Sequence, residues 1–131
     1  MKAQISPAVA PILLIEDEPS VTAFLRAALE RHGYAVASAA SGAEGLEMLT
    51  AGKYSGVISD IRMPGAVNGA EVHAWIQKNR PELCARIILI SGDTANSETQ
   101  AFLAQSGTPC IEKPFRVQQL MTVVEKTFGK P

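Results

Sequence analysis

The stretch VISDIRMPG, residues 57–65, places an aspartate, Asp60, at the end of an apolar run. A carboxylate at the mouth of a buried strand costs free energy unless a cation or a hydrogen-bond donor binds it. Two more acids, Glu16 and Asp17, follow another apolar run. If the two apolar runs are neighbouring strands, the three carboxylates come together at the ends of those strands, and they cannot all stay ionised there without a cation. Carboxylate oxygens are ligands that suit Mg²⁺. The sequence therefore predicts a magnesium site that includes Glu16, Asp17 and Asp60.

A hydroxyl and a lysine follow two other apolar runs. Lys113 precedes Pro114, which favours an extended backbone. We expect its ammonium to point over the rim, the edge at which the strands end and the three acids lie. Ser91 could hydrogen-bond a phosphoryl oxygen, or it could simply cap the next helix, although Asp93 or Asn96 would serve as well. A lone lysine is usually an ordinary exposed charge, so the prediction depends on the combination of residues.

The acidic stretch EDEPS, residues 16–20, has a structural reading of its own. Asp17 or Glu18 could cap a helix whose first residue is Pro19. Both readings can hold, because Glu18 can cap while Glu16 and Asp17 face the rim.

Strand-length apolar runs alternate with helical patterns along the chain. The runs are PILLI (11–15), YAVASA (34–39), SGVIS (55–59), RIILI (86–90) and TPCIE (108–112). Apolar residues at helical spacing predict helices near 21–29, 42–51, 69–79, 96–105 and 117–128. Because parallel strands need crossover connections, this alternation predicts a doubly wound α/β domain with helices on both faces of a parallel sheet. In such sheets ligands bind beyond the carboxyl ends of the strands, where the acids, the serine and the lysine lie.

Length and composition indicate one globular domain. The chain has 131 residues, 47% of them hydrophobic and 19% charged, which disfavours disorder. The net charge of −1 offers no basic surface, so we expect no direct nucleic-acid binding. Cys84 and Cys110 match no zinc or redox spacing. Pro7, Pro11 and Glu16 interrupt the early apolar run, so we expect a cytoplasmic protein without membrane insertion.

Four short motifs together resemble the receiver domain of two-component response regulators. They are ED (16–17), DIRMPG (60–65), SG (91–92) and KPF (113–115). The resemblance spans residues 11–128, with an N-terminal tail at 1–10 and a C-terminal tail at 129–131. It implies a flavodoxin-like fold, a single (βα)5 domain whose five-stranded parallel sheet has the order 2-1-3-4-5.

By that resemblance, Asp60 is the phosphoacceptor. It would take a phosphoryl group from the phosphohistidine of a histidine kinase or a histidine phosphotransfer domain. Glu16 and Asp17 would bind Mg²⁺, which Mn²⁺ can replace, with Asp60 and the backbone carbonyl of Arg62 as further ligands.

The resemblance also implies a switch. Ser91 would be the switch hydroxyl, and Lys113, joined to Pro114 by a cis peptide bond, would contact the phosphoryl group. A face formed by the fourth helix, the fifth strand and the fifth helix would then shift and bind a downstream protein. Two features depart from the family. Cys110 stands where an aromatic residue often follows the switch hydroxyl, and the loop MPGAVNG (63–69) is one residue longer than usual.

The resemblance implies a phosphoacceptor rather than a turnover enzyme, with no output domain in this chain. A stand-alone regulator or phosphate shuttle and a receiver excised from a hybrid histidine kinase or longer regulator both remain open. A haloacid-dehalogenase-type phosphatase would need an acid where Arg62 stands, and a flavodoxin would need a hydroxyl- and glycine-rich loop in place of EDEPS. The stronger alternative is a receiver-like binding module that is not phosphorylated, although every ionic site residue is present.

Overall fold

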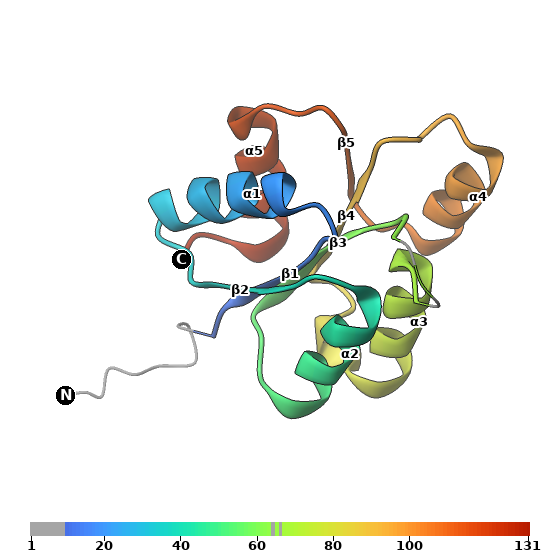
Figure 1. Ribbon diagram of the computed structural model, residues 1–131, viewed down its shortest axis with the longest axis horizontal. Coiled ribbons are helices and arrows are strands. Elements are labelled where there is room, and N and C mark those ends of the chain that lie inside the picture. Colours follow the sequence, from blue (N-terminus) through green and yellow to red (C-terminus); the bar gives the residue numbers. More distant parts are fainter. Residues whose placement is uncertain (1–9, 64, 66) are drawn as a thin grey trace.

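The computed structural model describes residues 10–63, 65 and 67–131, so the predicted tail at 1–10 lies almost wholly outside the described residues. Within them, five parallel strands form one sheet in the order β2-β1-β3-β4-β5 (Figure 1). The strands are β1 (Ile12–Ile15), β2 (Val36–Ala39), β3 (Gly56–Asp60), β4 (Ile87–Ser91) and β5 (Cys110–Glu112). The predicted fold class and strand order are confirmed.

The helices follow the strands as the apolar spacing predicts. They are α1 (Pro19–Arg31), α2 (Gly42–Ala51), α3 (Gly69–Asn79), α4 (Ser97–Ser106) and α5 (Val117–Phe128), with a 3-10 turn at Pro81–Leu83. In Figure 1, α1 and α5 cover one face of the sheet, and α2 and α3 cover the other. No helix in the described ranges has the length and apolarity to cross a membrane.

The central strands are buried along their whole length. Every residue of β1, β3 and β4 is buried. Because side chains alternate along a strand, Ile12 and Leu14 pack in the core beneath α1 and α5, whereas Leu13 and Ile15 pack in the core beneath α2 and α3. Apolar packing on both faces therefore fixes the register that delivers Asp60 and Ser91 to the carboxyl edge.

Local sequence sets where the helices begin. The Asn68 side chain accepts from the backbone N–H of Glu71, in a reciprocal capping box that starts α3. The Asn96 side chain accepts from the backbone N–H groups of the residues at 98 and 99, so Asn96 caps α4. The alternative that Ser91 caps this helix is therefore wrong.

Close backbone packing joins α3 to the end of β3. The Gly69 N–H donates to the carbonyl oxygen of Ile61 at 2.9 Å. A Cβ on Gly69 would lie 2.5 Å from the carbonyl oxygen of Asp60 and 2.6 Å from the Ile61 Cα. These are backbone atoms that cannot rotate away, so only glycine allows this approach. The predicted extra loop residue falls in 63–69, where residues 64 and 66 lie outside the described part of the chain.

Gly69→Ala should lower the free energy of unfolding by about 1–3 kcal/mol, because the added methyl group forces the backbone at Asp60 to move. Urea denaturation measures this change directly. Gly92→Ala is the matched control, since a Cβ there would come no closer than 3.9 Å to the Lys113 side chain. Equal losses of stability in the two variants would contradict the close packing.

Candidate functional site

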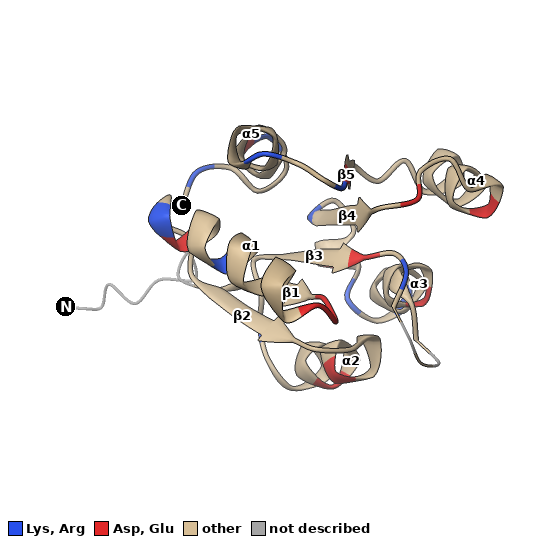
Figure 2. Cartoon of the chain, turned by 45° about the horizontal axis from the view of Figure 1, so that its top comes forward, with Lys and Arg blue, Asp and Glu red and all other residues tan. Residues whose placement is uncertain are grey.

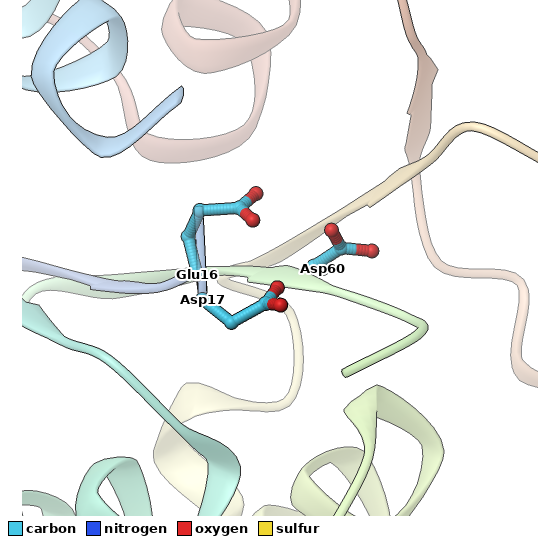
Figure 3. Close-up of side chains that lie close together, drawn as sticks. All are labelled: Glu16, Asp17 and Asp60. Atoms are coloured by element: carbon cyan, nitrogen blue, oxygen red, sulfur yellow. The ribbon is translucent and has the colours of Figure 1, made fainter. Parts of the chain in front are cut away.

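Three carboxylates meet at the carboxyl edge of the sheet. Glu16 and Asp17 follow β1, and Asp60 ends β3, the neighbouring strand. One carboxylate oxygen from each lies within 4.8 Å of the others (Figure 3). Glu16 and Asp60 are buried, and Asp17 is half-buried. The predicted gathering of these acids is confirmed. Figure 2 shows acidic residues, in red, at the ends of β1 and β3.

Lys113 reaches the same place from the end of β5, passing over β4. Its Nζ lies 2.7 Å from Oδ2 of Asp60 and 3.3 Å from Oε1 of Glu16. A third carboxylate oxygen, Oε1 of Glu18, lies 3.2 Å from the same nitrogen. The Lys113–Pro114 peptide bond is cis, as the resemblance implied. One ammonium therefore faces three acids, so the pocket keeps an excess of negative charge.

The Glu16 carboxylate is only partly satisfied by the protein. Its Oε2 accepts from the Glu18 N–H at 3.1 Å. Its Oε1 is buried and accepts no hydrogen bond from the described residues, although the Lys113 ammonium is near. Burial raises the pKa of Glu16 to about 7 despite the hydrogen bond from Glu18, and the charge of Asp60 adds to the rise. A buried oxygen of this kind, beside two other acids, fits the ligand set that Mg²⁺ prefers.

Lys113 stays protonated in this pocket, because its acidic neighbours raise the pKa of its side chain. Burial by itself would lower the pKa of Lys113. The hydrogen bond to Asp60 and the negative charges of Asp60 and Glu16 outweigh that effect, so the pKa lies above its ordinary value. Lys113 is therefore a permanent cation and hydrogen-bond donor beside Asp60.

Hydrogen bonds from the following loop orient the Asp60 carboxylate. Its Oδ1 accepts from the Arg62 N–H at 3.1 Å, while its Oδ2 accepts from Lys113. Ser59 donates its hydroxyl to the Asp60 carbonyl oxygen at 2.9 Å. Both carboxylate oxygens thus have fixed directions before any ligand binds. The role of the Arg62 carbonyl as a metal ligand stays a prediction.

Ser91 and Cys110 lie near the acids without contacting them through hydrogen bonds in the described structure. Ser91 is buried at the end of β4, next to β3, and its Oγ accepts from the Asp93 N–H at 3.0 Å. Cys110 is half-buried on β5, where burial raises the pKa of its thiol and the charges of Glu112 and Asp60 add to this. The thiol is therefore neutral and packs as a small apolar group.

Sequence reasoning missed the side chain of Glu18. It predicted Glu18 only as a helix cap, and Glu18 does occupy the cap position of α1. Its side chain makes no cap hydrogen bond, however, and contacts Lys113 instead. The available signal was a third acid directly after Glu16 and Asp17, ahead of a proline that starts the helix.

Comparison with known proteins gives one consistent family. The family model for the response regulator receiver domain matches residues 12–125. The chain is 32% identical over 123 residues to the sensor kinase CckA of Brucella abortus, covering 92% of this chain and 13% of that protein. It is 33% identical over 120 residues to the transcriptional regulatory protein GlrR of Escherichia coli, covering 90% and 27%. The chain thus spans well under half the length of either relative.

Solved structures agree with this match. A response regulator receiver domain protein from Methanospirillum hungatei superposes with a TM-score of 0.81 at 26% identity, covering 92% of this chain and 94% of that one. The response regulator TrrA of Thermotoga maritima, solved in complex with Mg²⁺-BeF, gives a TM-score of 0.77 at 32% identity, covering 90% and 98%.

The raised pKa of Glu16 should make the metal-free protein less stable as pH rises. The unfolded chain releases the Glu16 proton near the ordinary value of 4.5, whereas the folded protein keeps it to about 7. Between these values the folded state binds more protons, so rising pH favours unfolding. Glu16→Gln removes this penalty, and its stability relative to the natural protein should rise by about 1–3 kcal/mol across that window.

Urea titrations in a chelating buffer at several pH values measure this difference. Glu47→Gln, which removes the charge of an exposed acid on α2, is the control for the loss of one carboxylate. A pH-independent difference for Glu16→Gln would contradict the raised pKa.

Proposed function

Because the chain belongs to the family of response regulator receiver domains, we propose that it accepts a phosphoryl group on Asp60 and works as a phosphorylation switch. The observation that carries this proposal is the setting of the Asp60 carboxylate. It is buried and lies 2.7 Å from a lysine ammonium, with two further acids close by.

In the proposed reaction, an oxygen of Asp60 attacks the phosphorus of a phosphohistidine on a partner protein. The P–O bond forms as the P–N bond breaks, the imidazole leaves with the bonding electron pair, and it takes up a proton. The product is an acyl phosphate on Asp60. This makes the protein a phosphoacceptor that assists its own modification, rather than an enzyme that turns over a separate substrate.

The residues of the pocket supply position and charge. Phosphoryl transfer has a loose, highly charged transition state, so catalysis is mainly alignment and electrostatic stabilisation. The Arg62 N–H and the Lys113 ammonium hold the two oxygens of Asp60 in fixed directions. Lys113 can then donate to a phosphoryl oxygen as negative charge develops there.

Mg²⁺ is the proposed cofactor. Glu16, Asp17 and Asp60 would hold it, with the carbonyl of Arg62 as a further ligand, and Mn²⁺ could replace it. When bound, the ion would offset the negative charge of the phosphoryl oxygens and of the three acids. The Glu16 oxygen that accepts no hydrogen bond in the described structure supports this assignment, because it is available to bind an ion. Mg²⁺ prefers oxygen ligands of this kind.

The proposed switch uses the hydroxyl of Ser91. That hydroxyl accepts from the Asp93 N–H, and a hydroxyl can also donate its own proton. Donation to a phosphoryl oxygen would therefore couple the new group to the loop before α4. Thr99 is the one fully buried residue of α4, and Phe102 and Leu103 are only partly buried against the core, so we expect this helix to shift more easily than the others. Allosteric couplings of about 1–3 kcal/mol suffice for a population shift of this kind.

The proposed partners are a histidine kinase or a histidine phosphotransfer domain as the donor and a protein that reads the face formed by α4, β5 and α5. The site of action is proposed to be the cytoplasm, which suits two free cysteines. The relatives include a sensor kinase and transcriptional regulators, so both a stand-alone protein and part of a longer one remain candidates.

Incubation with acetyl phosphate and Mg²⁺ should add one phosphoryl group to the protein, detected by intact mass. Asp60→Asn should add none, because an amide is a poor nucleophile. Asp93→Asn is the matched control, since Asp93 is an exposed aspartate outside the acid cluster, and it should still be labelled. An unlabelled natural protein, under conditions that label another receiver, would favour a module that binds without being phosphorylated.

Lys113→Ala should separate phosphorylation from the switch. The adduct should still form, but the phosphorylation-dependent NMR shifts in α4 and α5 should be much smaller, because the cation that contacts the phosphoryl group is gone. Lys53→Ala, at an exposed lysine remote from the pocket, should keep the full shifts. Full shifts in Lys113→Ala would contradict a role for Lys113 in the switch.

A further inference from the structure

The ammonium of Lys113 is shared among three carboxylates, and one of them has no assigned role. Asp60 is the proposed phosphoacceptor, and Glu16 belongs to the acid cluster that fits a cation. Glu18 is outside that cluster, yet its Oε1 lies 3.2 Å from Nζ of Lys113, as close as Glu16. The Lys113 ammonium donates hydrogen bonds to Asp60 and to Glu18, whereas Glu16 makes only an ion pair with it.

The side chain of Glu18 has no other task that the described structure reveals. It makes no cap hydrogen bond to α1, where Pro19 already begins the helix. It is also 57% exposed, so it contributes little to the core. The bond from Glu18 to Glu16 uses the backbone N–H, which any residue other than proline would supply. The contact with Lys113 is therefore the feature of this side chain that needs an explanation.

Glu18 and Lys113 meet at an open hollow beside the acid cluster. Both line an open hollow of about 500 Å³, together with Gly92 and the exposed ring of Phe24. The contact therefore lies at the solvent side of the acid cluster, whereas the Glu16 and Asp60 contacts of the same ammonium lie on its buried side.

A bound cation would change how strongly each acid attracts Lys113. The charges of Glu16 and Asp60 would then be largely offset by the ion, because opposite charges at close range cancel at the position of a third group. Glu18, outside the cluster, would keep its full charge. The attraction that holds the ammonium near the opening would thus come chiefly from Glu18.

We propose that Glu18 is a positioning residue that keeps the Lys113 ammonium at the mouth of the site when the cation is bound and before the phosphoryl group arrives. This inference rests on the proposed function. It assigns Glu18 a part in the rate of phosphorylation, through Lys113, with no contact to the reacting atoms.

Ordinary charge repulsion predicts the opposite effect, which makes the proposal testable. A carboxylate beside the opening repels an anionic phosphoryl donor, so repulsion alone means that removing the charge speeds phosphorylation. If Glu18 instead positions Lys113, removal of its carboxylate slows the reaction in spite of the lost repulsion.

The test measures the rate constant of phosphorylation by acetyl phosphate at saturating Mg²⁺ in two Glu18 variants. Glu18→Gln keeps the length of the side chain and removes its charge, whereas Glu18→Asp keeps the charge but is one methylene too short for the contact. Both should react about 1.5-fold to fivefold more slowly, the size expected for one exposed ionic contact. Glu112→Gln is the charge control, since Glu112 is an exposed acid next to Lys113 that binds Thr94, and it should not slow the reaction.

A second readout links the effect to Lys113. In a Lys113→Met background, Glu18→Gln should cause no further slowing, because the two residues act through one contact. In the natural protein loaded with Mg²⁺, the NMR resonances of the Lys113 ε-methylene should move on Glu18→Gln substitution, before any donor is added. Slowing that persists without Lys113 would overturn the proposal.

The outcomes separate this inference from the proposed function. A natural protein that gains no phosphoryl group under labelling conditions would refute the function itself. A natural protein that is labelled, with Glu18→Gln and Glu18→Asp as fast as it or faster, would refute only the positioning role. Slowing in both Glu18 variants, with Glu112→Gln unaffected, supports it.

Discussion

The ion pair between the Lys113 ammonium and the Asp60 carboxylate, 2.7 Å apart, is the contact on which the chemistry of the site depends. It joins the end of β5 to the end of β3 across β4. Lys113 also brings a cation into contact with three acids of the described structure, Glu16, Glu18 and Asp60. Because that single charge does not balance the acids, the pocket has an excess of negative charge, which is the property that the proposed binding of Mg²⁺ uses.

Apolar packing of the sheet holds this unfavourable group of charges in place. Buried strands with apolar side chains on both faces leave β1 and β3 no freedom to slip, since a one-residue shift would exchange the two cores. The backbone contact at Gly69 fixes the loop after Asp60. By contrast, Thr99 is the one fully buried residue of α4, while Phe102 and Leu103 pack partly buried against the core. The proposed switch uses this more exposed helix next to the Ser91 loop.

Much of the site could be predicted from the sequence because parallel strands deliver their last residues to one edge. Asp60 and Ser91 were found as polar ends of apolar runs, and Lys113 by its place before a proline. The contact of Glu18 could not be found this way, since it depends on side-chain direction rather than on order along the chain. The same holds for Asn96 as the cap of α4, where three residues were equally suitable, and for the backbone contact that requires Gly69.

The most direct test of the central claim is calorimetric titration of the protein with Mg²⁺. The account predicts uptake of one ion that becomes weaker by about tenfold or more, or ~1.4 kcal/mol, when Asp17→Asn removes an acid from the cluster. Glu47→Gln should bind as the natural protein does. Uptake that is unchanged in Asp17→Asn, or absent from the natural protein, would contradict the claim that these acids form one cation-dependent pocket.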